Sequence, residues 1–206
     1  MRVLVICDDY YHPAHVVRAG LDLVTGYAFD YIEDAADWSA EKMAQYPVVL
    51  YAKSNNVTAA NREPWITPDV EQALADYVRT GHGMLAVHSG TVVKDLPVLR
   101  ALIGGTFDHH PKQCPVTAQT VPGHPLTEGA EAFTVTDEHY HMIMDDPTID
   151  LFLTTVSEHS EQPGGWTRTE GEGRVAVLTP GHTVEAFTQP SFLRLVTNCL
   201  AWCAPA

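Results

Sequence analysis

Strand-like and helix-like apolar patterns alternate along the first ninety residues. Continuous apolar runs predict strands covered on both faces at residues 2–7, 47–52 and 83–88, with a shorter strand at 29–32. Between them, apolar residues recur at helical spacing from Val16 to Val24 and from Val70 to Val78. Strands and helices that alternate with short connections predict a parallel sheet with right-handed crossovers.

The second half of the chain is less regular. Its apolar segments predict further strands at residues 116–121, 133–136, 151–156 and 174–178, followed by a C-terminal helix that carries Phe192, Val196 and Cys199 on one face. No repeat, low-complexity tract or linker divides the sequence. We therefore predict one α/β domain over residues 1–206, a flavodoxin-like three-layer sandwich with a mainly parallel central sheet.

Charge and composition narrow the choice of partners. The chain has 26 acidic and only 12 basic residues, a net charge of −14, which disfavours nucleic acid and anionic membranes as partners. No apolar run approaches the roughly 20 residues of a membrane span, and the N-terminal run stops at Asp8, too early for a signal-peptide core. The sequence predicts a cytoplasmic protein that takes a small polar molecule, and a homo-oligomer is compatible with it.

Polar and titratable residues follow the predicted parallel strands directly. Asp9 and Tyr10 come after the first strand, His88 and Ser89 after the fourth, and His182 after the strand at 174–178. Ligands bind beyond the carboxyl ends of the strands in open parallel sheets. The sequence therefore predicts a site at this edge, although strand ends are polar in many proteins.

His88 is the strongest single candidate for a functional residue. It stands between an apolar strand and the small pair Ser89-Gly90, which suits a tight strand-to-helix turn that holds one side chain up into a crevice. The alternative is a histidine that is hydrogen-bonded to a loop carbonyl. A serine-hydrolase elbow is rejected, because Val87 and Thr91 stand where that motif requires glycine.

Further candidates lie in two segments that the pattern predicts to be loops. In 137–141, Glu138 could act as a general base with Tyr140 as its hydrogen-bonding partner, or the segment could be an exposed charged loop. In 107–111, at most one of the adjacent His109 and His110 is expected to reach a common site. His12 precedes a proline and is interpreted as part of a turn rather than as a ligand.

The chain has 11 histidines, so metal binding must be considered. Zinc takes three or four N, S or O ligands, and His88, His110 and His182 could supply them if the fold brings them together. The candidate cofactor is thus a divalent metal such as zinc. Tyr10, Tyr140 and Trp166 could stack on a sugar ring, although Trp166 could equally hold a loop in place.

An ordered set of short motifs resembles the trehalose-utilisation (ThuA-like) family across the whole chain. The set is made up of residues 85–91, Phe107 with His110-Pro111, residues 124–127, Asp137-Glu138 with Tyr140, and Gly173-Arg174-Val175 followed by Gly181-His182. That family is similar in fold to the class I glutamine amidotransferases. The resemblance implies that His88 holds the position of their nucleophilic cysteine, so a thioester route to ammonia is not expected.

The resemblance also implies a role in disaccharide use and, for some members, in the processing of 3-keto-glycosides. His88 or Glu138 would remove the proton at the second sugar carbon, and the group at the first carbon would leave. His110 and His182, or a bound metal, would stabilise the enolate. Asp9, Tyr10, Ser89, Tyr140 and Trp166 are then candidates to bind the sugar or glycoside.

Two functions remain open on the sequence alone. One is an enzyme that acts on keto-sugars by elimination or hydrolysis. The other is a carbohydrate-binding or regulatory module without catalysis on a degenerate amidotransferase-like scaffold. The enzyme requires four side chains to converge on one crevice, whereas the module permits them to point apart; the four are His88, His110, Glu138 and His182.

Overall fold

A nine-stranded mixed sheet forms the middle of the molecule, in the order β2-β1-β3-β4-β11-β10-β9-β6-β7. The computed structural model describes residues 1–205. The first five strands in this order are parallel to one another: β2 (Ala28–Ile32), β1 (Arg2–Ile6), β3 (Val48–Tyr51), β4 (Gly83–Val87) and β11 (Gly173–Leu178). The last four extend the sheet in antiparallel fashion: β10 (Glu161–Glu170), β9 (Asp150–Val156), β6 (Cys114–Thr120) and β7 (Phe133–Asp137).

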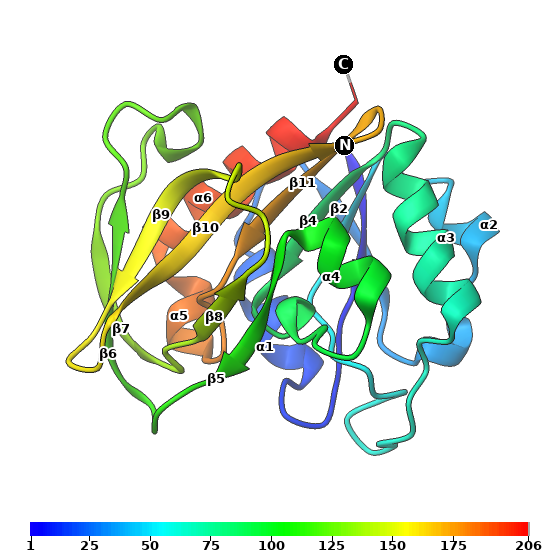
Figure 1. The fold of residues 1–206 in the computed structure, drawn as a ribbon, viewed down its shortest axis with the longest axis horizontal. Helices are drawn as coiled ribbons and strands as arrows, with labels where there is room; N and C mark the ends of the chain where they lie inside the picture. Colours follow the sequence, from blue (N-terminus) through cyan, green and yellow to red (C-terminus); the bar gives the residue numbers. More distant parts are fainter. Residues whose placement is uncertain (206) are drawn as a thin grey trace.

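Helices cover both faces of the parallel half and give the three layers (Figure 1). One face packs against α1 (Ala14–Leu21), α5 (Val184–Thr188) and α6 (Pro190–Cys203). The other packs against α2 (Ala40–Met43), α3 (Pro68–Arg79) and α4 (Pro97–Ile103). The α/β class and the flavodoxin-like parallel core are confirmed.

Two separate apolar cores explain the continuous apolar runs. Alternate residues of β1 face opposite sides, so that Val3 and Val5 join one core while Leu4 and Ile6 join the other, and all four are fully buried. A strand that is buried on both faces cannot show a polar face. The eight strands predicted from the pattern are all present, within about two residues at either end.

Short elements complete the chain between the main strands and helices. A separate two-stranded ribbon pairs β5 (Gly105–His109) with β8 (His141–Met144). Three 3₁₀ turns lie at Ala35–Asp37 (η1), His88–Thr91 (η2) and Pro125–Thr127 (η3). The expectation of a loop at 107–111 is corrected in part, because residues 107–109 belong to β5. The segment 137–141 runs from the last residue of β7 to the first residue of β8. No helix among residues 1–205 is long and apolar enough to cross a membrane.

Candidate functional site

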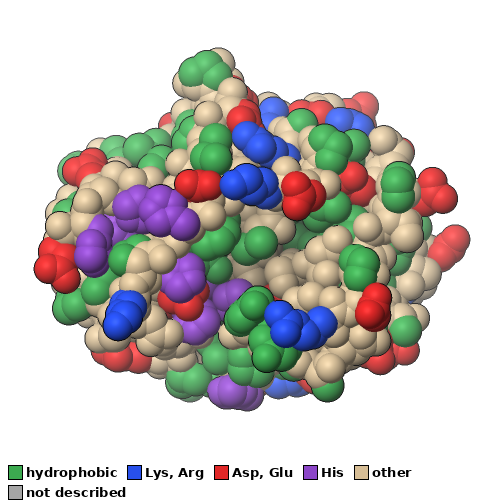
Figure 2. Space-filling model, turned by 60° about the horizontal axis from the view of Figure 1, so that its bottom comes forward, with side chains coloured by type: hydrophobic (Ala, Val, Ile, Leu, Met, Phe, Trp, Pro, Cys, Tyr) green, Lys and Arg blue, Asp and Glu red, His purple; other side chains and the backbone are tan. Residues whose placement is uncertain are grey.

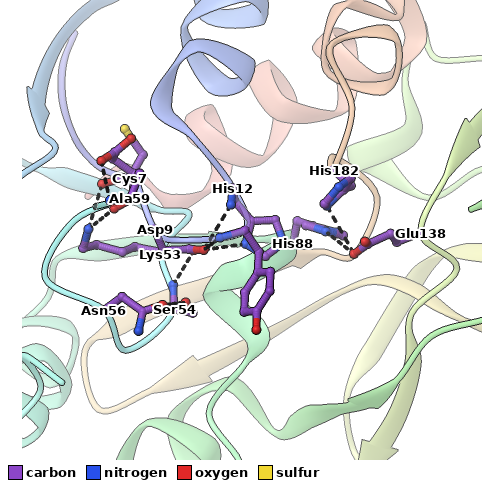
Figure 3. A network of polar contacts seen from close by, with 12 residues as sticks. Cys7, Asp9, His12, Lys53, Ser54, Asn56, Ala59, His88, Glu138 and His182 are labelled. Atoms are coloured by element: carbon purple, nitrogen blue, oxygen red, sulfur yellow. Dashed lines mark hydrogen bonds and ion pairs between the residues drawn. The ribbon is translucent and has the colours of Figure 1, made fainter. Parts of the chain in front are cut away.

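Three histidines and one glutamate meet beyond the carboxyl ends of the parallel strands. His12, His88, Glu138 and His182 each offer one ligand atom, and these atoms all lie within 4.8 Å of one another. We call these four residues the histidine–glutamate cluster (Figure 3). They follow β1, β4, β7 and β11, so that both halves of the sheet contribute to it.

His88 occupies a strained elbow at the end of β4. Its φ of +46° is uncommon for a residue with a side chain, and a Cβ on Gly90 would lie 2.1 Å from the Tyr51 carbonyl oxygen. The small residue that the sequence indicated is therefore required by the close approach of β3. The elbow directs the His88 imidazole toward the other three residues of the cluster, and the side chain is almost fully buried.

The two nitrogens of His88 have different surroundings. Nδ1 lies 2.8 Å from the Thr179 carbonyl oxygen, which only accepts, so Nδ1 carries the hydrogen and Nε2 carries a lone pair. Nε2 is buried without a hydrogen bond and lies 3.5 Å from Glu138 Oε2. Burial lowers the pKa of His88 below its ordinary value, which keeps the ring neutral. His88 therefore makes the hydrogen bond to a loop carbonyl and also lies in the histidine–glutamate cluster.

His12 is a member of the cluster that the sequence analysis set aside. Its Nδ1 donates to Asp9 Oδ1 over 2.8 Å, and Asp9 also accepts from the backbone N–H groups of Tyr11 and Ser54. Burial opposes the ionisation of Asp9, but these bonds with His12 and the backbone lower its pKa to about 2. The fixed Nδ1–H leaves His12 Nε2 as the acceptor, 3.4 Å from the Tyr140 hydroxyl.

Pro13 explains why the sequence analysis set His12 aside. Proline keeps the preceding residue extended, and here that conformation brings the His12 ring back over Asp9. The spacing Asp9-x-x-His12 directly after a buried strand was the available signal. A carboxylate that orients an imidazole through its second nitrogen is a common support for metal ligands.

Glu138 and Asp137 position His182 together. The two carboxylate oxygens of Asp137 accept the backbone N–H groups of Gly181 and His182, at 2.8 and 3.0 Å. Glu138 Oε2 lies 3.2 Å from His182 Nδ1. Burial opposes charge on both partners, but their ion pair raises the pKa of His182 and, with the contact to His88, lowers the pKa of Glu138.

A cavity of about 420 Å³ opens beside the cluster. His12, Glu138, Tyr140 and His110 line one part of it. Figure 2 shows the face that bears the strand ends, where histidine side chains gather next to a hollow. The volume falls within the range of small-molecule sites.

His110 presents a basic nitrogen beside this cavity. Its Nδ1 donates to the Pro111 carbonyl oxygen over 2.7 Å, which leaves the lone pair on Nε2. That Nε2 lies 3.6 Å from Glu138 Oε1, the oxygen that does not face His88 and His182. His110 thus lies next to the cluster and is outside the set of four, whereas the sequence analysis had grouped it with His88 and His182 as a ligand.

The expected sugar-binding residues divide into two groups. Tyr140 lines the cavity and stacks on His88 with ring centroids 3.9 Å apart, and Asp9 supports His12 from behind. Ser89 is buried in the elbow and does not line the cavity. Tyr10 is exposed and lies against the Arg62 guanidinium, outside the cavity wall, where Tyr11 stands instead.

Trp166 requires a correction. It lies on β10, is fully buried among the residues beneath α4, and donates its indole N–H to the Ile103 carbonyl oxygen. A side chain enclosed in this way cannot stack on a sugar. It does not fix a loop either, because the preceding Pro163-Gly164-Gly165 belongs to the strand.

The cluster suits a divalent metal ion of intermediate softness. His12 Nε2 and His88 Nε2 carry lone pairs, and the buried His88 Nε2 makes no hydrogen bond to the described residues. His182 Nδ1 lies beside Glu138, which adds a carboxylate. Three imidazoles and one carboxylate are ligands that zinc accepts. The hydrogen bonds from His12 to Asp9 and from His88 to Thr179 supply the outer support that such ligands require.

The fold and its histidine elbow define a flavodoxin-like three-layer α/β protein. Within that class, the model of the trehalose-utilisation (ThuA) family matches residues 2–203, and the chain belongs to this family. No curated protein matches the chain.

Solved structures agree with this fold. A ThuA-like protein from Parabacteroides merdae is similar with a TM-score of 0.79 and 15% identity, over 98% of this chain and 89% of that one. A second ThuA-like protein, from Bacteroides uniformis, is similar with a TM-score of 0.71 and 18% identity, over 98% of this chain and 91% of that one. A cytoplasmic protein from Salmonella typhimurium is similar with a TM-score of 0.70 and 14% identity, over 100% of both chains.

Proposed function

We propose that this protein cleaves 3-keto-glycosides by proton abstraction and elimination, followed by hydration, with a divalent cation such as zinc held by the histidine–glutamate cluster. The observation that carries the proposal is the arrangement at one cavity. A basic imidazole nitrogen of His110, the ionised Glu138 and three further histidines are gathered there. Membership in the trehalose-utilisation family supports a sugar as the ligand.

His110 is the group best placed to meet the substrate. His88, one of the two bases that the sequence analysis considered, is almost fully buried and does not line the cavity. The His110 side chain retains 35% exposure and lines it. A base must approach the proton that it removes within hydrogen-bond distance, directly or through one water molecule, so that geometry favours His110.

The reaction balances with this single base. His110 Nε2 takes the proton at C2, which the C3 carbonyl acidifies, and the C2–H electron pair becomes the C1=C2 double bond. The C1–O bond breaks with its electrons on the leaving oxygen, which receives the proton from His110. Addition of water across C1=C2 places hydroxyl on C1 and hydrogen on C2, so that the net change is hydrolysis.

The remaining residues stabilise charge and orient groups. Glu138 Oε1 faces His110 and stabilises its protonated form, while Oε2 faces His88 and His182. Tyr140 fills the space between His88 and the cavity. A bound cation would supply positive charge for the negative charge that develops on the C3 oxygen.

The test is turnover of 3-keto-trehalose by the wild type and by His110→Gln. We expect kcat to fall by about 10²–10⁴-fold in the variant, since that is the usual contribution of a positioned base. His159→Gln is the matched control, because His159 lies beside the exposed Glu158 and away from the cavity wall. Chelation should abolish wild-type turnover and added zinc should restore it.

Two results would overturn the proposed reaction. One is an absence of keto-glycoside turnover by the zinc-loaded wild type. The other is full activity in His110→Gln. Binding of the glycoside without turnover would favour the non-catalytic carbohydrate-binding module instead.

A further inference from the structure

The loop that follows β3 forms a second wall of the cavity. Ser54, Asn55 and Asn56 line it together with His12 and Glu138. Figure 3 shows Ser54 and Asn56 to one side of His12, with Glu138 and His182 to the other. A ligand whose reacting carbon lies at the cluster therefore extends its remainder toward this loop.

The amide group of Asn55 has a fixed orientation. Its Oδ1 accepts the backbone N–H groups of Trp65 and Ile66, at 2.9 and 2.8 Å. Only the amide oxygen can accept, so the assignment of oxygen and nitrogen follows from these two bonds. Nδ2 makes no hydrogen bond to any of residues 1–205, and the side chain is only partly exposed.

Its neighbours use their polar groups within the loop. Asn56 donates from Nδ2 to the Arg62 carbonyl oxygen and accepts from the Ser54 hydroxyl. Ser54 in turn donates its backbone N–H to Asp9. Asn55 is therefore the residue of this trio whose two side-chain N–H groups are both left for a ligand, whereas Asn56 has already used one of its two. The bonds to Trp65 and Ile66 fix the orientation of the Asn55 amide.

We propose that Asn55 determines specificity for the leaving group, its Nδ2 donating a hydrogen bond to a hydroxyl of the second sugar ring. The inference rests on the proposed function, because that function places the first ring at the cluster. A donor that is fixed before binding costs little entropy to use. The cavity is also lined by the apolar side chains of Val92, Leu96 and Phe107, which can contact the carbon atoms of the sugar rings.

The decisive variant is Asn55→Asp. A carboxylate oxygen still accepts from Trp65 and Ile66, so the loop keeps its conformation while the donor is lost. Asn61→Asp is the matched control in the same loop, because Asn61 accepts from Glu63 through Oδ1 and is exposed outside the cavity wall. Each variant is compared with the wild type on 3-keto-trehalose and on methyl 3-keto-α-glucoside.

We expect Asn55→Asp to lower kcat/KM for the disaccharide by about tenfold through KM, since a buried partner loses its hydrogen bond. The methyl glycoside should be processed at the wild-type rate by both variants. A merely structural defect of the loop would impair both substrates together. Equal loss on both substrates, or no loss on either, would overturn the inference.

A binding measurement separates this inference from the reaction itself. Calorimetric titration with trehalose and with methyl α-glucoside needs no turnover. If the wild type binds trehalose more tightly and Asn55→Asp loses that preference, the assignment of Asn55 stands even where keto-glycosides are not cleaved. If the wild type shows no preference for trehalose, the assignment fails even where cleavage occurs.

Discussion

Each histidine of the cluster is held in place by a hydrogen-bonding partner on the side away from the cavity. Each histidine of the cluster has one such contact: His12 with Asp9, His88 with Thr179, and His182 through its backbone with Asp137. The contacts of His12 and His88 decide which ring nitrogen faces the common point, and the contact of His182 fixes its backbone. The chemistry of the cluster therefore depends on residues that never reach the cavity.

Asp9→Asn tests this dependence. The amide keeps the size of the side chain but can present only one accepting oxygen, so the His12 ring loses its ionic hydrogen bond. We expect zinc affinity to fall by about 10–100-fold, the usual cost of losing an outer partner of a metal ligand. Competitive titration with a zinc-binding dye would measure it.

Asp30→Asn is the control for that titration. Asp30 lies on the edge strand β2 and pairs with Arg2 at the surface, outside the set of four cluster residues, and should leave zinc affinity unchanged. Unaltered zinc affinity in Asp9→Asn would show that His12 does not need its carboxylate partner or is not a ligand.

The sequence located His88, Glu138 and His182 because they directly follow strands or stand among proton-transfer groups. The contribution of His12 depended on how the chain turns around Pro13, which spacing alone does not reveal. Of the two adjacent histidines, the sequence analysis named His110 as the candidate. The ribbon gives a physical reason for the difference between them, because His109 pairs with His141 at its end while His110 continues past it.

Elements with regular patterns were predictable, and those with irregular ones were not. β10 was missed because Pro163, Gly164 and Gly165 are typical of a loop, whereas the strand passes through them with shifts in register. A Cβ at Gly165 would lie 2.8 Å from the Phe152 ring, so the glycine permits close approach between strands. Such a contact depends on which strand lies alongside β10, and a local sequence pattern does not predict that neighbour.

A substitution of Trp166 tests how much β10 contributes to the stability of the core. Trp166→Ala removes a fully buried indole and leaves the Ile103 carbonyl without its donor. We expect the free energy of unfolding to fall by about 3–5 kcal/mol, as for large-to-small changes in a core. Urea denaturation would measure it, and trehalose affinity in the remaining folded protein should be unchanged. A stable variant with lost sugar binding would restore the discarded role in stacking.

The elbow after β4 gives a second test. Gly90→Ala would place a Cβ 2.1 Å from the Tyr51 carbonyl oxygen, so β3 or the elbow must move. Gly26→Ala is the matched comparison: its φ is +84° but nothing lies within 4 Å of a Cβ. We expect a cost of about 1–2 kcal/mol at Gly26 from the backbone alone and a larger loss at Gly90. Equal losses in thermal denaturation would show that the elbow tolerates displacement.

The whole molecule combines an acidic surface with a site that joins both halves of its sheet. His12, His88 and His182 come from the parallel half and Glu138 from the antiparallel extension. The class of fold follows from local patterns, since buried parallel strands and amphipathic helices have distinct periods. The four antiparallel strands attach at β11, and this order of strands rests on long-range packing that the sequence did not disclose.

Acid stability links the site to the whole fold. The pKa of Asp9 is lowered from 3.8 to about 2 in the folded protein, so the unfolded chain binds a proton before the folded one does as pH falls. The ionised carboxylate thus contributes on the order of 2 kcal/mol of stability above about pH 4, and this contribution disappears as pH falls through 2.

Comparison of the wild type with Asp9→Asn isolates this contribution, because the other carboxylates titrate in both proteins. We expect the difference in free energy of unfolding to be constant from pH 5 to 7 and to shrink as the pH is lowered toward 2. Urea denaturation at each pH would measure it. A difference that stays constant down to pH 2 would mean that the His12 and backbone hydrogen bonds do not depend on an ionised Asp9, and the electrostatic support of the cluster would then have to come from Glu138.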